Sequence, residues 1–302
     1  MTHRFVSLGE CMVELAPAGE ANLLLQGFAG DTLNTAWYMR KLLRPDWQVD
    51  YVTCVGSDAI SGKMLAFFRD AGLATDHVQS RRDSTVGLYL ITLDNGERSF
   101  SYWRSDSAAK RLCQDPALVP GALQGAATAY FSGITLGILS EDDRTKLLDH
   151  LRTARAAGVE IVFDPNLRPA LWDSPQTMCA ATMQAAEVAD VVLPSYDDEA
   201  QYFGDADLKA TAERYAQRGS GLVVVKNGGA EMLTLDQGAF ATHAATAPEA
   251  IVDTTAAGDS FNAGFLATRA QGATLAEAMR GGADLAAKVI AHRGALVPGI
   301  AL

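Results

Sequence analysis

Residues 253–264 read Asp-Thr-Thr-Ala-Ala-Gly-Asp-Ser-Phe-Asn-Ala-Gly and fall where a helix is expected to begin. A helix start leaves backbone N–H groups without partners, and its positive end attracts anions. Ala256, Ala257 and Gly258 would supply these groups to the charge that develops on a transferred phosphoryl group. Asp259, in the first helical turn, could accept a proton from an attacking hydroxyl. An isolated Gly-Asp-Ser would only cap a helix, but the full run with both glycines favours phosphoryl transfer.

A second candidate segment is Gly-Phe-Ala-Gly-Asp-Thr-Leu-Asn at residues 27–34. Gly30 would let the backbone approach a ligand closely, and Asp31 and Asn34 could hydrogen-bond to hydroxyl groups. In the alternative interpretation Asp31 caps a helix and Asn34 is a solvated helical residue. The residue types therefore fit a sugar, but they do not require one.

Short apolar runs alternate with segments of helical period along most of the chain. This alternation predicts an α/β fold with a mostly parallel sheet covered on both faces, and ligands of such folds bind at the carboxyl ends of the strands. Strands are expected at residues 5–9, 51–56, 129–133, 159–164, 190–194, 222–226 and 231–235, and helices at 31–43, 61–71, 141–157, 175–186, 207–218, 257–271 and 275–291.

Residues 84–104 depart from this alternation of strands and helices. Two alternating runs, 86–93 and 98–104, flank Asp94-Asn95-Gly96, which predicts a β-hairpin. A hairpin has no place among parallel strands, so we expect it to project as a flap. There are no internal repeats or linkers. The prediction from these patterns is one domain over residues 1–302 with this hairpin as a flap.

The charge balance excludes several classes of partner. The chain has 302 residues, with 25 Lys and Arg against 36 Asp and Glu, a formal net charge of −11. An acidic surface repels nucleic acid and anionic membranes, so neither is expected as a partner. Four scattered cysteines without a CxxC pair indicate free thiols in a reducing cytoplasm. No signal peptide or membrane span is expected.

These segments resemble those of the PfkB (ribokinase-like) carbohydrate kinases. The likeness covers residues 253–265, residues 27–34 and the late Arg293-Gly-Ala segment. Within that family the chain is most similar to the 2-keto-3-deoxygluconate kinases, at residues 9–14, 30–36, 96–104 and 163–169. The resemblance implies a single ribokinase-like domain with a three-layer α/β/α fold and a small β lid formed from about residues 10–30 and 84–106.

The resemblance also implies how the sugar is bound. Gly30, Asp31 and Asn34 would bind hydroxyl groups beside the base Asp259. A keto-acid sugar carries a carboxylate, which arginine binds bidentately. Two arginines with tyrosine hydroxyls would explain how so acidic a chain holds an anion, and the implied residues are Tyr89, Tyr102, Arg104 and Arg168. Trp103, on the opposite face of the strand, is expected to pack or to contact a second subunit.

The nucleotide site follows from the same resemblance. Residues 223–229, Val-Val-Val-Lys-Asn-Gly-Gly, would lie beside ATP. Many family members carry Asn-x-x-Glu, tied to Mg²⁺ and phosphate, where this chain has Ser195 and Asp198, so Asp198 would act on Mg²⁺ through water. Asp253 and Thr255 could hold a monovalent cation such as K⁺. The implied ATP ligands are Asn166, Arg168, Ser195, Lys226, Gly228, Gly229, Ala257 and Gly258.

The reaction that this resemblance implies is transfer of the γ-phosphoryl group of ATP to the C6 hydroxyl of 2-keto-3-deoxy-D-gluconate. Three alternatives remain open: a kinase for fructose, ribose or another gluconate derivative, a nucleoside kinase, and a non-catalytic sugar-binding regulator. A neutral-sugar or nucleoside kinase would not need Arg104 and Arg168, and a silent regulator would be expected to lose Asp259. The protein is expected to form a dimer or a higher homo-oligomer.

Overall fold

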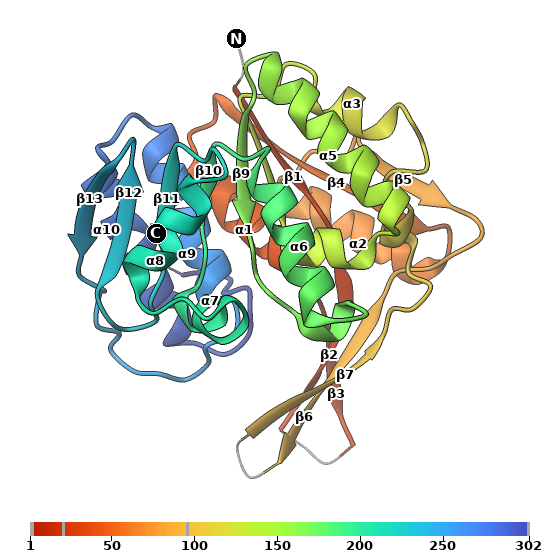
Figure 1. Ribbon diagram of the computed structural model, residues 1–302. Coiled ribbons are helices and arrows are strands. Elements are labelled where there is room, and N and C mark those ends of the chain that lie inside the picture. The colour runs from red at the N-terminus through yellow and green to blue at the C-terminus, as the bar shows by residue number, and fades with distance from the viewer. Residues whose placement is uncertain (1–2, 20–21, 95–96, 301–302) are drawn as a thin grey trace.

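The computed structural model describes residues 3–19, 22–94 and 97–300, and a nine-stranded sheet forms its centre (Figure 1). The strand order is β13-β12-β11-β10-β9-β8-β1-β4-β5. Strands β11 to β5 in this order are parallel, and β12 and β13 continue the sheet antiparallel. The strands are β1 His3–Leu8, β4 Trp47–Gly56, β5 Val78–Arg81, β8 Thr128–Ser132, β9 Glu160–Asp164, β10 Val191–Val192, β11 Leu222–Val225, β12 Met232–Asp236 and β13 Ala239–His243.

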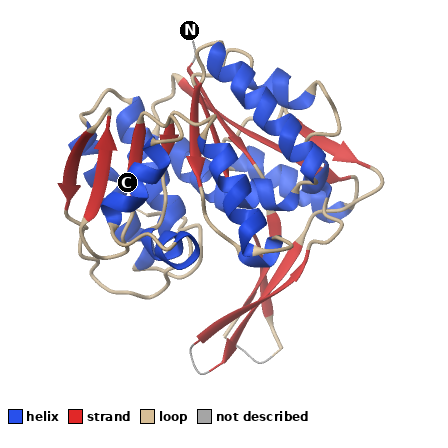
Figure 2. Cartoon of the chain, in the orientation of Figure 1, coloured by secondary structure: helices blue, strands red, loops and turns tan. Residues whose placement is uncertain are grey.

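Helices cover both faces of this sheet (Figure 2). Successive strand residues alternate between the two layers: Val191 packs in one core and Val192 in the other, as the two-residue period of a strand requires. One layer holds α1 Asp31–Leu42, α2 Ala59–Asp70, α9 Ala257–Ala270 and α10 Leu275–Ile290. The other holds α3 Leu118–Leu123, α4 Gly133–Ile138, α5 Glu141–Ala156, α6 Pro175–Ala186, α7 Tyr196–Phe203 and α8 Leu208–Ala216, with short 3-10 turns at Ala108–Arg111 and Pro169–Leu171.

A second, four-stranded sheet projects from the body of the molecule at the bottom of Figure 1. Its order is β3-β2-β6-β7, with the hairpins β2/β3 and β6/β7 joined through the parallel pair β2/β6. The turn predicted at Asn95 and Gly96 lies outside the described residues. We call this sheet the lid; its strands are β2 Met12–Pro17, β3 Leu24–Ala29, β6 Leu88–Asp94 and β7 Glu97–Trp103.

The predicted α/β class, the mostly parallel sheet and the small β lid are confirmed. The patterns missed the edge strands β5 and β13 and the short helices α3, α4 and α7. Most residues of β13 are exposed and none of β5 is buried, so neither strand carries the apolar alternation on which the prediction depended. Over the described residues, no helix is long and apolar enough to cross a membrane.

Candidate active site

A cavity of about 860 Å³ lies where helix α9, the start of α1, the loops after β9 and β11 and the lid meet. Strands β1, β8, β9 and β11 all point their carboxyl ends to one edge of the sheet, because they are parallel. That edge is where open α/β sheets bind ligands. Asp31, Asp164, Lys226 and Asp259 line the cavity, although they are far apart in the sequence.

The start of α9 forms one wall of this cavity. Ala256 is the residue before the helix and has a left-handed backbone with φ 60°, a conformation that costs a non-glycine residue energy. The N–H of Ala257 bonds to the carbonyl of Thr254 at 3.2 Å. The amides of Gly258 and Asp259 begin the helix, where no intrahelical acceptor exists. This wall can therefore bind an anion.

The carboxylate of Asp259 is buried within the same turn, with only 9% exposure. Its Oδ2 accepts a hydrogen bond of 2.8 Å from Nδ2 of Asn34, and its backbone carbonyl accepts one from Thr35. Burial, and then the negative charge of Asp31, raise its pKa to about 7, although the Asn34 hydrogen bond lowers it. A carboxylate that titrates near neutral pH is suited to general base catalysis.

Asp31 and Asn34 reach the cavity from the first turns of α1. Asp31 Oδ2 accepts a 2.9 Å hydrogen bond from Nδ2 of Asn166. Burial raises the pKa of Asp31, and the charge of Asp164 adds to the increase. Gly30 lines the cavity as well, and a Cβ there would lie 2.1 Å from the carbonyl oxygen of Glu10. Glycine is therefore required by the packing of α1 against the start of the lid.

A buried network under the wall of α9 holds Lys226. Its ammonium lies 3.3 Å from Asp164 Oδ1 and 3.1 Å from Asn262 Oδ1. Asn262 donates 2.8 Å to Asp164 Oδ2 and 3.0 Å to the hydroxyl of Tyr130. A Cβ on Gly258 would lie 3.6 Å from the ammonium. The network thus holds one cation close to the amides of α9.

Lys226 was predicted from the sequence as a site residue. The other members of this network, Asp164, Asn262 and Tyr130, were not. Asp164 ends a buried strand, which is a signal that could have indicated it. Asn262 lies inside the 253–264 run, but nothing in the sequence indicated that its side chain contacts Lys226 and Asp164. Nothing in the sequence around Tyr130 indicated it.

Arg168 and Asp198 face each other across the cavity at 3.8 Å. Burial raises the pKa of Asp198, against the lowering influence of Arg168. The Arg168 side chain is 52% exposed, so its guanidinium remains accessible to a ligand. Ser195 and Asn166 also line the cavity. Gly228 and Gly229 are absent from the described lining; both are exposed in the turn after β11.

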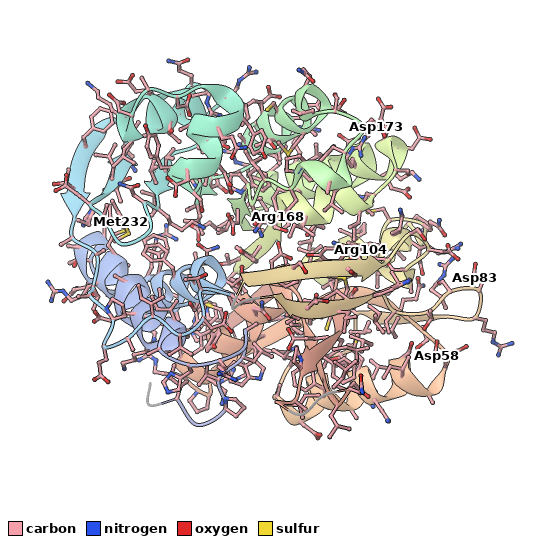
Figure 3. All side chains as sticks on the ribbon, turned by 90° about the horizontal axis from the view of Figure 1, so that it is seen from below. Asp58, Asp83, Arg104, Arg168, Asp173 and Met232 are labelled. Atoms are coloured by element: carbon pink, nitrogen blue, oxygen red, sulfur yellow. The ribbon has the colours of Figure 1, made fainter. Side chains whose placement is uncertain are left out.

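The lid contributes two of its three predicted ligands to this cavity. Tyr89 and Tyr102 are paired across β6 and β7, and both line it. The Tyr89 hydroxyl donates to Glu14. Arg104 forms an ion pair with the buried Glu10 and lines a neighbouring pocket instead. In Figure 3 Arg104 lies beside the lid strands and Arg168 lies above them.

Asp253 and Thr255, the residues predicted for a monovalent cation, lie before α9. Oδ1 of Asp253 accepts the N–H of Thr255 at 3.0 Å and Oδ2 accepts that of Gly294 at 2.6 Å. The first bond stabilises the local turn, and the second connects the segment before α9 to the C-terminal part of the chain. Within the described residues, no group of three or more His, Cys, Asp and Glu is arranged to hold a metal ion.

Phosphoryl transfer to a hydroxyl group needs a group that can accept a proton and a site that can bind an anion. The carboxylate of Asp259 and the amides at the start of α9 fit these two needs, so the geometry suits a phosphotransferase. The chain belongs to the pfkB family of carbohydrate kinases, because the sequence model of that family matches residues 2–300. The predicted family and the predicted carbohydrate kinase class are thereby confirmed.

Three relatives illustrate the similarity. The 2-dehydro-3-deoxygluconokinase of Dickeya dadantii is 38% identical over 98% of this chain and 97% of its own length. A fructokinase of Salmonella typhimurium is 31% identical over 87% of this chain and 83% of its own length. The fold is similar to that of a putative ribokinase II from Escherichia coli, solved in complex with ATP and Mg²⁺, with TM-score 0.83, 20% identity and coverage of 98% of this chain and 94% of that one.

Proposed function

We propose that this kinase transfers the γ-phosphoryl group of ATP to the C6 hydroxyl of 2-keto-3-deoxy-D-gluconate. The observation that carries the proposal is the position of Asp259, buried at the start of α9 with its pKa near 7. The 38% identity to a 2-dehydro-3-deoxygluconokinase over nearly all of both chains supports the choice of sugar.

In the proposed reaction Asp259 takes the proton of the C6 hydroxyl as the oxygen attacks phosphorus. Asn34 fixes one oxygen of Asp259, which leaves the other oxygen to face the hydroxyl. Asp31 would bind sugar hydroxyls, and the hydrogen bond that it accepts from Asn166 in the same cavity holds its carboxylate in position. The lid residues Tyr89 and Tyr102 would cover the sugar and exclude water.

The acid group of the sugar would bind to Arg168. This guanidinium is accessible in the cavity, and its nearest acid, Asp198, lies at 3.8 Å, a distance too long for a close bidentate pair. The predicted role of Arg104 in the same contact depends on a movement of the lid, because Arg104 is now paired with Glu10. Arg168 is therefore the residue on which selection of an acidic sugar depends.

The phosphates of ATP would bind at the α9 amides and Lys226, where the helix end and a buried ammonium lie together. Mg²⁺ prefers oxygen ligands and retains several waters, and the carboxylates of Asp164 and Asp198 in the cavity fit that preference. When bound, Mg²⁺ neutralises charge on the phosphates. The monovalent-cation site at Asp253 and Thr255, the ATP contacts of Gly228 and Gly229, the homo-oligomer and the cytoplasmic location remain predictions.

The test is an assay of ADP release with a panel of sugars. We expect 2-keto-3-deoxy-D-gluconate to exceed fructose, ribose and adenosine by at least about tenfold in kcat/KM, equivalent to about 1.4 kcal/mol of transition-state discrimination. A higher value for fructose would refute the proposed substrate and leave the kinase class intact. Absence of ADP release with every sugar would favour the non-catalytic alternative.

A further inference from the structure

A second pocket of about 790 Å³ lies at the base of the lid, outside the site described above. Neither Asp259 nor the start of α9 lines it. Its walls come from the loop before β6, the end of β7 and the segment that follows it, the end of α4, and the 3-10 turn Pro169–Leu171 after β9. We call it the outer pocket and define it by six of its lining residues: Arg82, Trp103, Arg104, Ser107, Lys110 and Leu171.

The outer pocket carries positive charge on a protein whose net charge is −11. Arg104 is neutralised by Glu10, but among the described residues neither Arg82 nor Lys110 has an acidic partner within 4.0 Å. The one acid in the wall, Asp106, is 78% exposed and pairs with Arg111. Two cations are thus uncompensated in a concave site, where low-dielectric walls strengthen their field.

Three polar atoms on residues that line this pocket are buried and have no hydrogen-bond partner in the described part of the chain. They are Oγ of Ser84, Oγ of Ser107 and Nε of Arg104. Ser107 is 3% exposed. A buried polar group without a partner costs about 1–3 kcal/mol, so such groups mark a position where a ligand or ordered water belongs. Hydroxyls and a guanidinium N–H together with two cations are suited to a phosphate or carboxylate group.

Aromatic and aliphatic side chains complete the pocket. Trp103 is 59% exposed and lines the outer pocket, and its expected contact with a second subunit stays a prediction. Val86 and Leu171 provide further apolar surface. The volume falls in the usual range of about 300–1,000 Å³ for small-molecule sites. An apolar wall beside a cationic end fits a sugar-sized organic anion.

We propose that the outer pocket binds a small phosphorylated or carboxylated metabolite and that its occupancy alters the affinity of the enzyme for its sugar. The coupling runs through Tyr102, which lines both cavities, and through Arg104, whose partner Glu10 lies two residues before the lid strand β2. A ligand that binds Arg104 would break its ion pair with Glu10 and so release the segment that leads into lid strand β2. Binding at the outer pocket and binding at the sugar site would then affect each other reciprocally.

The binding test uses calorimetric titration of the full chain with citrate and, separately, with inorganic phosphate. The sugar and a non-hydrolysable ATP analogue are saturating, so that the α9 amides are occupied. The double variant R82Q/K110Q removes the two cations. The matched control R44Q/K63Q removes two exposed cations elsewhere, so both variants have the same net charge. Binding of citrate would indicate a site for carboxylates, and binding of inorganic phosphate would indicate a site for phosphate groups.

We expect at least one of the two anions to bind with a Kd below about 1 mM, at least tenfold more weakly to R82Q/K110Q, and with unchanged affinity to R44Q/K63Q. Absence of binding to the ternary complex, or equal loss in both variants, would overturn the proposed site. Steady-state ADP release then tests the coupling: the anion should change KM for the sugar at least twofold in the parent and not in R82Q/K110Q. Purely competitive inhibition that persists in R82Q/K110Q would assign the anion to the sugar site and reject the proposal.

Discussion

Asn34 and Asp259 lie 225 residues apart in the chain, yet Nδ2 of Asn34 donates to Oδ2 of Asp259 at 2.8 Å. The bond joins the first turns of α1 and α9, which pack side by side in one helical layer. It fixes the direction of the carboxylate and opposes the increase in its pKa. A contact between two helix starts thus orients the Asp259 carboxylate and moderates the increase in its pKa that burial causes.

Replacement of Asp259 by Asn should abolish turnover and spare sugar binding. Asn keeps the shape and can still accept the Asn34 hydrogen bond, but it cannot take a proton. We expect kcat to fall by about 10²–10⁴-fold, the usual contribution of a general base, with the sugar Kd changed less than about threefold. ADP release and calorimetry measure the two quantities. Turnover within tenfold of the parent would show that Asp259 is not the base.

The pH profile should show that the active form of Asp259 is ionised. Its pKa is raised to about 7, so kcat/KM should decline as pH falls through about 7. Asp31 raises this pKa through its charge, so D31N should move the decline to lower pH, whatever its effect on the maximum. The exposed variant D46N is the control and should leave the midpoint unchanged. A midpoint that stays fixed in D31N would contradict this coupling.

Loss of Lys226 should destabilise the fold through Asp164. K226M would leave the Asp164 carboxylate, which is 2% exposed, without its cation. Breaking a buried pair in this way costs about 3–5 kcal/mol of unfolding free energy. Adding D164N removes the buried charge, so K226M/D164N should recover more than half of the loss in urea unfolding. The exposed K209M should change stability by less than about 0.5 kcal/mol. Additive losses in the double variant would show that the pair is not coupled.

Arg168 should decide between acidic and neutral sugars. R168M removes the accessible guanidinium of the cavity, so KM for 2-keto-3-deoxy-D-gluconate should rise at least tenfold while KM for a neutral sugar such as fructose changes little. R218M, which removes an exposed arginine paired with Glu187, should alter neither value. Equal increases for both sugars would assign Arg168 to the nucleotide instead.

Ala256 should be a site of stored backbone strain. Its φ of 60° is left-handed, and Gly adopts that conformation without penalty. A256G should therefore stabilise the protein by about 1 kcal/mol, seen as a higher urea midpoint. The neighbouring A257G lies within the helix and should instead cost up to about 1 kcal/mol. Equal effects of the two variants would exclude strain at Ala256.

The local patterns of the sequence were sufficient to predict strands β1, β4, β8, β9, β10, β11 and β12 of the main sheet and the longer helices that cover it. They also located Asp259 in the first turn of α9 and the hairpin 86–104 in the lid. These features depend on periods of two and 3.6 residues and on helix-start chemistry, which a short window of sequence contains. The edge strands β5 and β13 lacked such a pattern and could not be predicted.

The tertiary structure alone decided which side chains meet. Lys226 reaches Asp164 across 62 residues and Asn262 across 36, and Arg104 turns to Glu10 across 94. Such contacts follow from the packing of helices on a parallel sheet, whose strands pair over long separations. Residue types therefore established which groups could act as base, anion hole and acid ligand, while packing and burial determined the pKa of Asp259 and placed Arg104 outside the cavity.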